Sequence, residues 1–300
     1  MKKRVVIFLF LTAVLTGIPA RSQTSQSLIA PGARVEKLSE GFSFTEGPAV
    51  DSRGNVYFTD QPNDRIYMWS IDGKLSTFLE NTGRANGLYF DRQGRLLSCS
   101  DLDNEIWSFG MDGKHTVIVT DFEGRKLNGP NDLWVHPDGS IYFTDPLYKR
   151  RYWSRDPEMQ QKGQYLYYVK PGGREPQLID TDFQQPNGII GSPDGRLLYV
   201  ADIGAQKTYV YNIQPDGSLS GKKLFATMGS DGITMDEKGN IYLTGRGVTI
   251  FNPSGEQIEQ IPVEAGWTAN VCFGGQDMQT LFITASQYLY SVRMNVKGIR

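Results

Sequence analysis

Short apolar stretches alternate with polar turns along almost the whole chain, and they recur in the same order. The recurring unit begins with a polar residue and continues with an apolar stretch, a glycine-bearing turn and a second apolar stretch, as in "TEGPAVDSRGNVYFTD" (45–60) and "PNGIIGSPDGRLLYVAD" (186–202). An aromatic-rich third stretch such as "RIYMWS" (65–70) follows, and the fourth is less regular. Glycine supplies the positive φ that tight hairpins often require. The pattern therefore predicts antiparallel β-strands, with almost no helical periodicity.

The period of this unit predicts the fold. Its leading polar residue occurs six times, at intervals of 39 to 56 residues, as Glu46, Asn86, Asn131, Asn187, Asp231 and Asn270. Four short strands repeated about every 40 residues are typical of the blades of a β-propeller. We therefore predict an all-β fold, a six-bladed β-propeller, because a β-sandwich would not explain the return of the same turn. The stretch "ARVEKLSEGFSF" (33–44) belongs to no unit, and we predict that this N-terminal strand completes the sixth blade and closes the ring.

The first residues do not follow the repeat. A basic start, "MKKR" (1–4), precedes the apolar run "VVIFLFLTAVLTGIPA" (5–20), and small residues follow it. This order is typical of a secretory signal peptide, and the apolar run is short for a membrane anchor. We predict a signal peptide over 1–22 that is removed, and a single propeller domain over 23–300. The expected location is periplasmic or secreted, without a membrane attachment after cleavage.

Charge and cysteine content narrow the functions further. Removal of residues 1–22 leaves a net charge of about −6, which makes nucleic acids and anionic membranes poor partners. Cys99 and Cys272 lie in apolar contexts of non-neighbouring repeats. Although an exported protein can form a disulfide, we predict two buried free thiols. We expect a monomer.

The six leading polar residues predict a binding site. The first strand of each propeller blade lines the central channel, so equivalent positions at its start should form a ring around the axis. This ring would carry one Glu, one Asp and four Asn, and such oxygen donors suit Ca²⁺ better than zinc or copper. The competing interpretation is that each Asn or Asp merely caps a turn. Its recurrence at six equivalent positions favours the ring.

Four motifs carry a resemblance to a known family: "FTEGPAVDSRGNVYFTD" (44–60), "LNGPNDLWVHPDGSIYFTDP" (127–146), "QPNGIIGSPDGRLLYVAD" (185–202) and "SDGITMDEKGNIYLTG" (230–245). In this order and spacing, the chain resembles the SMP-30/gluconolactonase/luciferin-regenerating-enzyme family of six-bladed propellers. The resemblance implies a divalent cation at one mouth of the channel, usually Ca²⁺, with Mg²⁺, Mn²⁺ or Zn²⁺ as other candidates. The ligand roles that it implies fall on Glu46, Asn131, Asn187 and Asp231.

The resemblance also implies an activity. Family members hydrolyse lactones, notably sugar-acid lactones, so the expected partner is a small-molecule lactone. The cation would polarise the carbonyl, and Asp231 would act as the general base or as the nucleophile. Asn86 and Asn270 receive no ligand role and are candidates for substrate binding. Two alternatives stay open, a non-catalytic carbohydrate- or protein-binding propeller with a structural metal, and a phosphotriester hydrolase.

An insertion, "DPLYKRRYWSRDPEMQQKGQ" (145–164), accounts for the longest interval between repeats. It combines aromatic residues with several lysines and arginines, and loops of this length are often functional. We expect its charges to be solvated individually and the insertion as a whole to cover the site as a lid. Tyr148 and Trp153 are its candidates for substrate binding.

Overall fold

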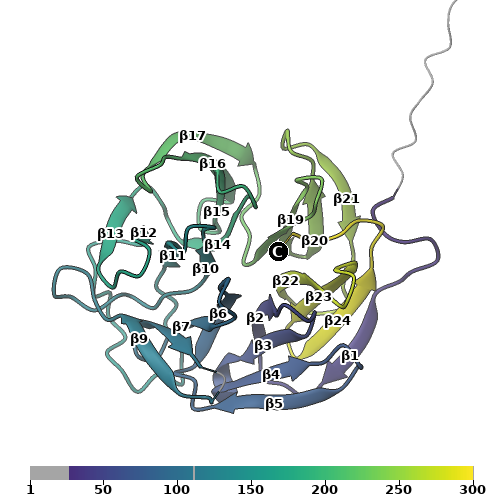
Figure 1. Cartoon of the computed structure of the whole chain (residues 1–300), viewed down its shortest axis with the longest axis horizontal. Helices are drawn as coiled ribbons and strands as arrows, with labels where there is room; N and C mark the ends of the chain where they lie inside the picture. Colours follow the sequence, from purple (N-terminus) through teal and green to yellow (C-terminus); the bar gives the residue numbers. More distant parts are fainter. Residues whose placement is uncertain (1–26, 111, 300) are drawn as a thin grey trace, which may run out of the picture.

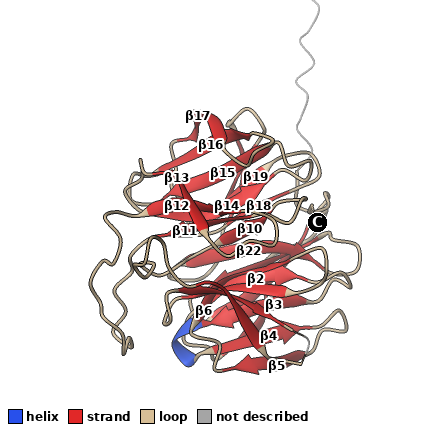
Figure 2. Cartoon of the chain, turned by 60° about the vertical axis from the view of Figure 1, so that its left-hand side comes forward, coloured by secondary structure: helices blue, strands red, loops and turns tan. Residues whose placement is uncertain are grey.

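The computed structural model describes residues 27–110 and 112–299, so the predicted signal peptide lies outside the described residues. Six four-stranded antiparallel sheets are arranged as blades around a central axis (Figure 1). Figure 2 shows, in a turned view, that strands dominate the molecule and that loops connect them. The predicted six-bladed β-propeller is confirmed. No helix among the described residues is long and apolar enough to cross a membrane.

Five blades are built from consecutive strands, innermost strand first. The first three are formed by β2 (Thr45–Val50), β3 (Val56–Asp60), β4 (Arg65–Trp69) and β5 (Leu75–Glu80); by β6 (Ala85–Phe90), β7 (Leu96–Ser100), β8 (Glu105–Phe109) and β9 (His115–Val119); and by β10 (Leu133–Val135), β11 (Ile141–Asp145), β12 (Tyr165–Val169) and β13 (Pro176–Asp180). The next two are formed by β14 (Pro186–Gly191), β15 (Leu197–Asp202), β16 (Lys207–Ile213) and β17 (Leu219–Ala226); and by β18 (Ile233–Met235), β19 (Ile241–Gly245), β20 (Gly247–Phe251) and β21 (Gln257–Ile261).

The sixth blade joins the two ends of the described chain. It contains β22 (Thr268–Gly274), β23 (Thr280–Ala285) and β24 (Tyr288–Arg293), and its outermost strand is the N-terminal β1 (Glu36–Glu40). β1 pairs antiparallel with β24, beside which it runs in Figure 1. The predicted closure by an N-terminal strand is consistent with this pairing. It covers an edge of β24 that would otherwise offer unpaired backbone groups.

The repeated turn between the first and second strands is held by a carboxylate. In the first blade, Asp51 Oδ1 accepts hydrogen bonds from the backbone N–H groups of Arg53 and Asn55, each at 2.9 Å. Gly54 follows with φ +97°, a conformation that favours glycine. Asp91 and Asp236 hold the corresponding turns in the same way. The recurrence of Asp and Gly in this turn therefore has a local structural cause.

The aspartate that ends β3, β11 and β15, preceded by a threonine in β3 and β11, explains how the blades are aligned. Asp145 accepts the N–H groups of Asn128 and Gly129, both at 2.9 Å, and so fixes the loop that enters the first strand of its own blade. Asp60 and Asp202 hold the equivalent loops of the first and fourth blades. Thr144 Oγ1 donates to Asn187 O of the following blade at 2.8 Å. One dipeptide therefore fixes the innermost strand of its own blade and of the next.

Both cysteines are buried free thiols, as predicted. Cys99 packs in an apolar cluster between the second and third blades, with Leu97 and Leu133 among its members. Cys272 packs with Val56 and Phe58 between the sixth blade and the first. Burial raises the pKa of each thiol, so both behave as small apolar side chains.

Deletion of β1 tests the closure. A chain that begins at Gly41 lacks β1 and the buried Leu28, whereas a control chain that begins at Ser27 keeps both. We expect the shorter chain to lose at least about 3 kcal/mol of unfolding free energy, from lost apolar burial and strand pairing. Thermal unfolding and light scattering measure the stability and the aggregation at the exposed β24 edge. Equal melting temperatures for the two chains would contradict the closing role.

Candidate functional site

The six leading polar residues of the repeats stand at the entry of the innermost strands, as the sequence predicts. Glu46, Asn86, Asn187 and Asn270 lie within β2, β6, β14 and β22, and Asn131 and Asp231 lie two residues before β10 and β18. All are buried except Asp231, which is partly exposed. Each innermost strand contacts the innermost strands of both neighbouring blades, so the six residues surround the axis.

Close approach between these strands explains the glycine that follows four of the six residues. A Cβ on Gly47 would lie 1.9 Å from Asn86 O of the next blade, and Gly47 has φ +41°. A Cβ on Gly232 would lie 2.0 Å from Asn270 Oδ1. Any side chain at these positions would push the strands apart, so the motifs "EG" and "DG" are required by the packing around the axis.

Asp231 is held by two donors. Trp267 Nε1 donates to Asp231 Oδ2 at 2.6 Å, and Asn187 Nδ2 donates to Asp231 Oδ1 at 2.7 Å. Asn187 Nδ2 also donates to the Tyr148 hydroxyl at 2.8 Å. The amide nitrogen of Asn187 is thus fully used, whereas Asn187 Oδ1 is buried and has no hydrogen-bond partner among residues 27–110 and 112–299. An unpaired buried acceptor is costly, and this one needs a donor or a cation.

Negative charge is concentrated at the same place. Burial raises the pKa of Glu46 well above its usual range, and the charges of Asp231 and Asp132 raise it further. Burial also raises the pKa of Asp231, against the opposing effects of Trp267 and Asn187. Glu46 Oε2 accepts one N–H, from Gly47 at 3.0 Å. Ionising Glu46 and Asp231 together is therefore unfavourable here unless a positive charge is close to both.

The donor set fits a hard divalent cation. Two carboxylates and the carboxamide oxygens of Asn131 and Asn187 are the ligand types that calcium prefers. The backbone of Asn131 is fixed, since its N–H donates to Thr144 O and its carbonyl accepts from Gly87. Within residues 27–110 and 112–299, no three His, Cys, Asp or Glu side chains are placed to hold a metal ion. The carboxamide oxygens of Asn131 and Asn187 are therefore the candidates to join the two carboxylates in such a coordination shell.

Asp132 is a site residue that the sequence reasoning missed. It is buried, and its carboxylate accepts hydrogen bonds from the N–H groups of Leu133, at 2.9 Å, and Ile189, at 3.4 Å. Burial raises the pKa of Asp132 to about 8, with a smaller contribution from Asp231. The signal was present in the repeats, because four of them have glycine directly after the leading polar residue and the third has Asp132.

Asn270 faces a different space from the four predicted ligands. Its Oδ1 accepts the N–H of Val271 at 2.8 Å, and its side chain lines a cavity of about 840 Å³ between the innermost strands. Asp132 also lines this cavity, with apolar side chains such as Trp134 and Phe273 around it. The four predicted ligands are absent from its lining. Asp132 and Asn270 therefore lie between the charged cluster and the cavity.

The insertion reaches the charged cluster. Tyr148 accepts the hydrogen bond from Asn187, and the guanidinium of Arg150 lies 4.9 Å from the centre of the Tyr148 ring. The charge of Arg150 lowers the pKa of both Glu46 and Asp231. Tyr148 thus touches a predicted ligand, Asn187, directly.

Asn86, another sequence-predicted candidate for substrate binding, is buried in the neighbouring second blade.

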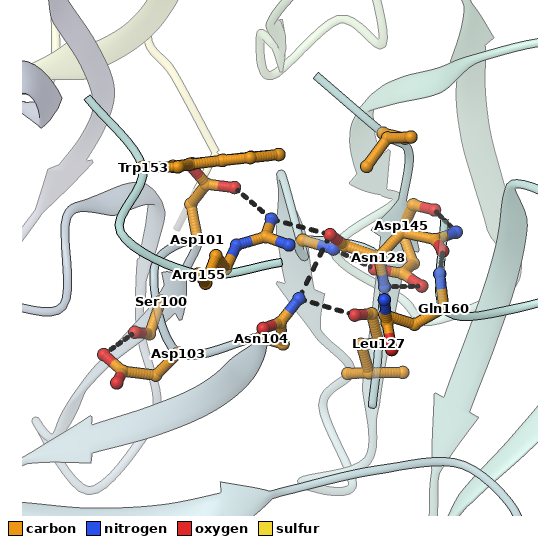
Figure 3. Close-up of polar contacts among 12 residues, drawn as sticks. Ser100, Asp101, Asp103, Asn104, Leu127, Asn128, Asp145, Trp153, Arg155 and Gln160 are labelled. Atoms are coloured by element: carbon orange, nitrogen blue, oxygen red, sulfur yellow. Dashed lines mark hydrogen bonds and ion pairs between the residues drawn. The ribbon is translucent and has the colours of Figure 1, made fainter. Parts of the chain in front are cut away.

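A second part of the insertion is fastened to the second blade, as Figure 3 shows. Trp153 Nε1 donates to Asp101 Oδ2 at 2.7 Å, and Arg155 forms an ion pair with Asp101 Oδ1 at 3.2 Å. The guanidinium of Arg155 also stacks on the Trp153 ring, 3.5 Å from its centre, and donates to Asn128 O at 2.7 Å. The expectation that each charge of the insertion is solvated is therefore wrong for Arg155, whose side chain is 9% exposed.

Asp101 is available for this contact because the second repeat departs from the others. Where other blades end β3, β11 or β15 with an aspartate that holds their own loop, β7 ends with Ser100. Ser100 Oγ donates to Gly83 O at 3.0 Å and fixes the corresponding loop. The displaced carboxylate of Asp101 then binds the insertion. The sequence signal for it is "LSCS" (97–100) where the first blade has "YFTD" (57–60), with Asp101 one residue later.

Comparisons with known proteins agree with this architecture. Residues 44–287 match the profile of the SMP-30/Gluconolactonase/LRE-like region. A gluconolactonase of Zymomonas mobilis is 27% identical over 88% of this chain and 82% of its own length. The structure of a gluconolactonase from Xanthomonas campestris is similar with a TM-score of 0.83, at 30% identity over 89% of this chain and 91% of that one.

A more distant structure shares the fold. Regucalcin from Agrobacterium tumefaciens, described as a calcium-binding protein, is similar with a TM-score of 0.72 at 19% identity. The similarity covers 90% of this chain and 96% of that one.

The ion pair between Asp101 and Arg155 gives a test of how the insertion is held. Asp101→Asn leaves a buried guanidinium without its counter-charge, which typically costs about 3–5 kcal/mol. We expect faster hydrogen exchange of residues 145–164 and a lower melting temperature. Glu158→Gln is the matched control, because its ion pair with Lys149 is exposed and surface pairs contribute about 0–1 kcal/mol. The same exchange rates in both variants would show that the Asp101 contact does not hold the insertion.

Proposed function

On the premise that this chain belongs to the SMP-30/gluconolactonase/LRE-like family and is a gluconolactonase-like lactone hydrolase, we propose that it opens sugar-acid lactones with the help of a bound divalent cation, calcium by preference. The observation that carries the proposal is the unpaired, buried Asn187 Oδ1 beside the uncompensated carboxylates of Glu46 and Asp231. A cation bound among these oxygens would supply the positive charge that balances the carboxylates.

The residues that would hold the cation are the four oxygen donors Glu46, Asn131, Asn187 and Asp231. Calcium accepts more ligands than these four provide, so water and a substrate oxygen can complete its shell. Bound there, a divalent cation would polarise the lactone carbonyl and stabilise the negative charge that develops on its oxygen. The calcium-binding description of the related regucalcin structure supports the choice of metal.

The residues of this chain contribute orientation and proton transfer. Trp267 and Asn187 hold one oxygen each of the Asp231 carboxylate, so its plane is fixed while lone pairs on both oxygens stay free. Asp231 can therefore accept a proton from an attacking water, or attack the carbonyl itself. A single turnover in ¹⁸O-labelled water separates the two paths: only the nucleophilic path, in which Asp231 forms an anhydride with the opened lactone, can leave the label in Asp231, when water hydrolyses that anhydride at the Asp231 carbonyl. Tyr148, through Asn187, links the insertion to this arrangement.

Export is part of the proposal. The basic, apolar and small-residue segments of residues 1–22 support a cleaved signal peptide, and with it a periplasmic or secreted enzyme. Fractionation of cells that express the full chain, with N-terminal sequencing of the product, tests cleavage near Ser22 and Gln23.

Removal of the metal tests the proposal directly. We expect chelation to abolish hydrolysis of aldonolactones and added Ca²⁺ to restore it. Glu46→Gln should weaken Ca²⁺ binding at least about tenfold, since one of two ligand charges is lost. Asp91→Asn is the control, because Asp91 holds the turn that follows β6, at the opposite end of that strand from Asn86. Calorimetric Ca²⁺ titration measures both variants. Full hydrolytic activity in a metal-free sample would contradict the proposal.

Asp231→Asn separates catalysis from a structural metal. The variant keeps an oxygen ligand and the shape of the side chain but cannot accept a proton or attack the carbonyl. We expect kcat to fall by about 10²–10⁴, with Ca²⁺ still bound. Steady-state kinetics with aldonolactones, acyl-homoserine lactones and aryl phosphotriesters, combined with metal analysis, gives the result. No turnover of any compound by either protein would favour the non-catalytic binding propeller.

A further inference from the structure

Arg150 is the cation of the insertion that remains without a counter-ion near the site. Arg155 pairs with Asp101, and Lys149 pairs with Glu158 at 2.8 Å on the surface. Arg84, at the same mouth, lies over the Tyr152 ring and donates to backbone carbonyls. Arg150 forms no ion pair with any residue in 27–110 or 112–299, and its Nε is buried without a hydrogen-bond partner.

The position of Arg150 is defined by the site. Its guanidinium lies 4.9 Å from the centre of the Tyr148 ring, and the hydroxyl of that ring accepts the hydrogen bond from Asn187. Arg150 is therefore one side chain away from a proposed ligand. Arg150 donates to neither carboxylate, because the hydrogen bonds of Glu46 and Asp231 come from Gly47, Trp267 and Asn187.

The unpaired guanidinium of the partly buried Arg150 is available to bind an anion. Its planar donors match a carboxylate or a sulfonate, and a buried donor without an acceptor is costly. The carboxylates of Glu46 and Asp231 do not supply the acceptor. A bound substrate can, if it carries an anionic group apart from the lactone carbonyl that the cation would polarise.

We propose that Arg150 is an anion-binding residue that selects lactones with a second, negatively charged group, such as the lactones of sugar dicarboxylic acids. This inference rests on the proposed lactone hydrolysis and names its substrate class. The lactone carbonyl lies toward Asp231, and the carboxylate of the substrate lies toward Arg150. The insertion, held by Asp101, keeps Arg150 in place over the mouth.

The test uses a matched pair of substrates, glucono-1,4-lactone and glucaro-1,4-lactone, which differ in carrying an alcohol or a carboxylate at C6. We expect the calcium-loaded enzyme to prefer the glucarolactone. Arg150→Gln should lower kcat/KM for the glucarolactone roughly 10- to 100-fold, the effect expected for loss of a charge-assisted hydrogen bond, mainly through KM. For the gluconolactone the change should stay within about threefold.

Two further variants sharpen the result. Arg150→Lys keeps the charge without the planar donors and should recover part of the glucarolactone activity. Arg151→Gln is the matched control, since Arg151 is an exposed neighbour in the same insertion. It should leave both substrates unaffected. An equal loss for both lactones in Arg150→Gln would mean that Arg150 only positions Tyr148, and no loss for either would mean that it is unused. Both results would overturn the inference.

A binding measurement separates this inference from the proposed function. Calorimetry with glucarate and gluconate, the products, requires no turnover. We expect Arg150→Gln to weaken glucarate binding about tenfold or more and gluconate binding little. If the wild-type protein hydrolyses neither lactone but shows this difference, the proposed function fails and the anion site stands. If it hydrolyses both lactones without the difference, hydrolysis stands and the anion site fails.

Discussion

The close approach of the six innermost strands around the axis is the constraint on which the rest of the structure depends. At Gly47 and Gly232 there is no space for even a Cβ against the next blade. Thr144 Oγ1 adds a hydrogen bond from one blade to the strand of the next that carries a proposed ligand. Because the strands are this close, polar residues at equivalent positions of distant repeats must meet.

The proximity of the carboxyl groups among these polar residues is electrostatically unfavourable without a cation. Glu46 and Asp231 are brought together in a poorly solvated place, where each raises the free energy of the other in the charged state. Hydrogen bonds from Trp267 and Asn187 orient Asp231 but do not neutralise the cluster. The fold thus places two carboxyl groups that are costly to ionise together near an unpaired amide oxygen, and these are donor types that suit a divalent cation.

The departures from the repeat gather around the same mouth. Asp132 stands where four other blades have glycine, Ser100 replaces the usual aspartate and frees Asp101, and the insertion follows β11. Asp101 then holds the insertion, and the insertion brings Tyr148 and Arg150 to the charged cluster. A nearly symmetric scaffold acquires one asymmetric, functional side through these few changes, while the regular blades supply rigidity.

The sequence by itself determined the number of blades, the strand order, the closing strand and the ring of polar residues. Those features depend on local patterns, such as the Asp–Gly turn at Asp51, which repeat with a readable period. Tertiary structure alone decided which side chains interact across blades: that Arg155 is buried against Asp101 and that, within the part of the chain that the structure describes, the Asn187 oxygen is unpaired and Arg150 has no counter-ion. These contacts join residues that are far apart in the chain, so no local period encodes them, and the path of the insertion through space is what brings their charges together.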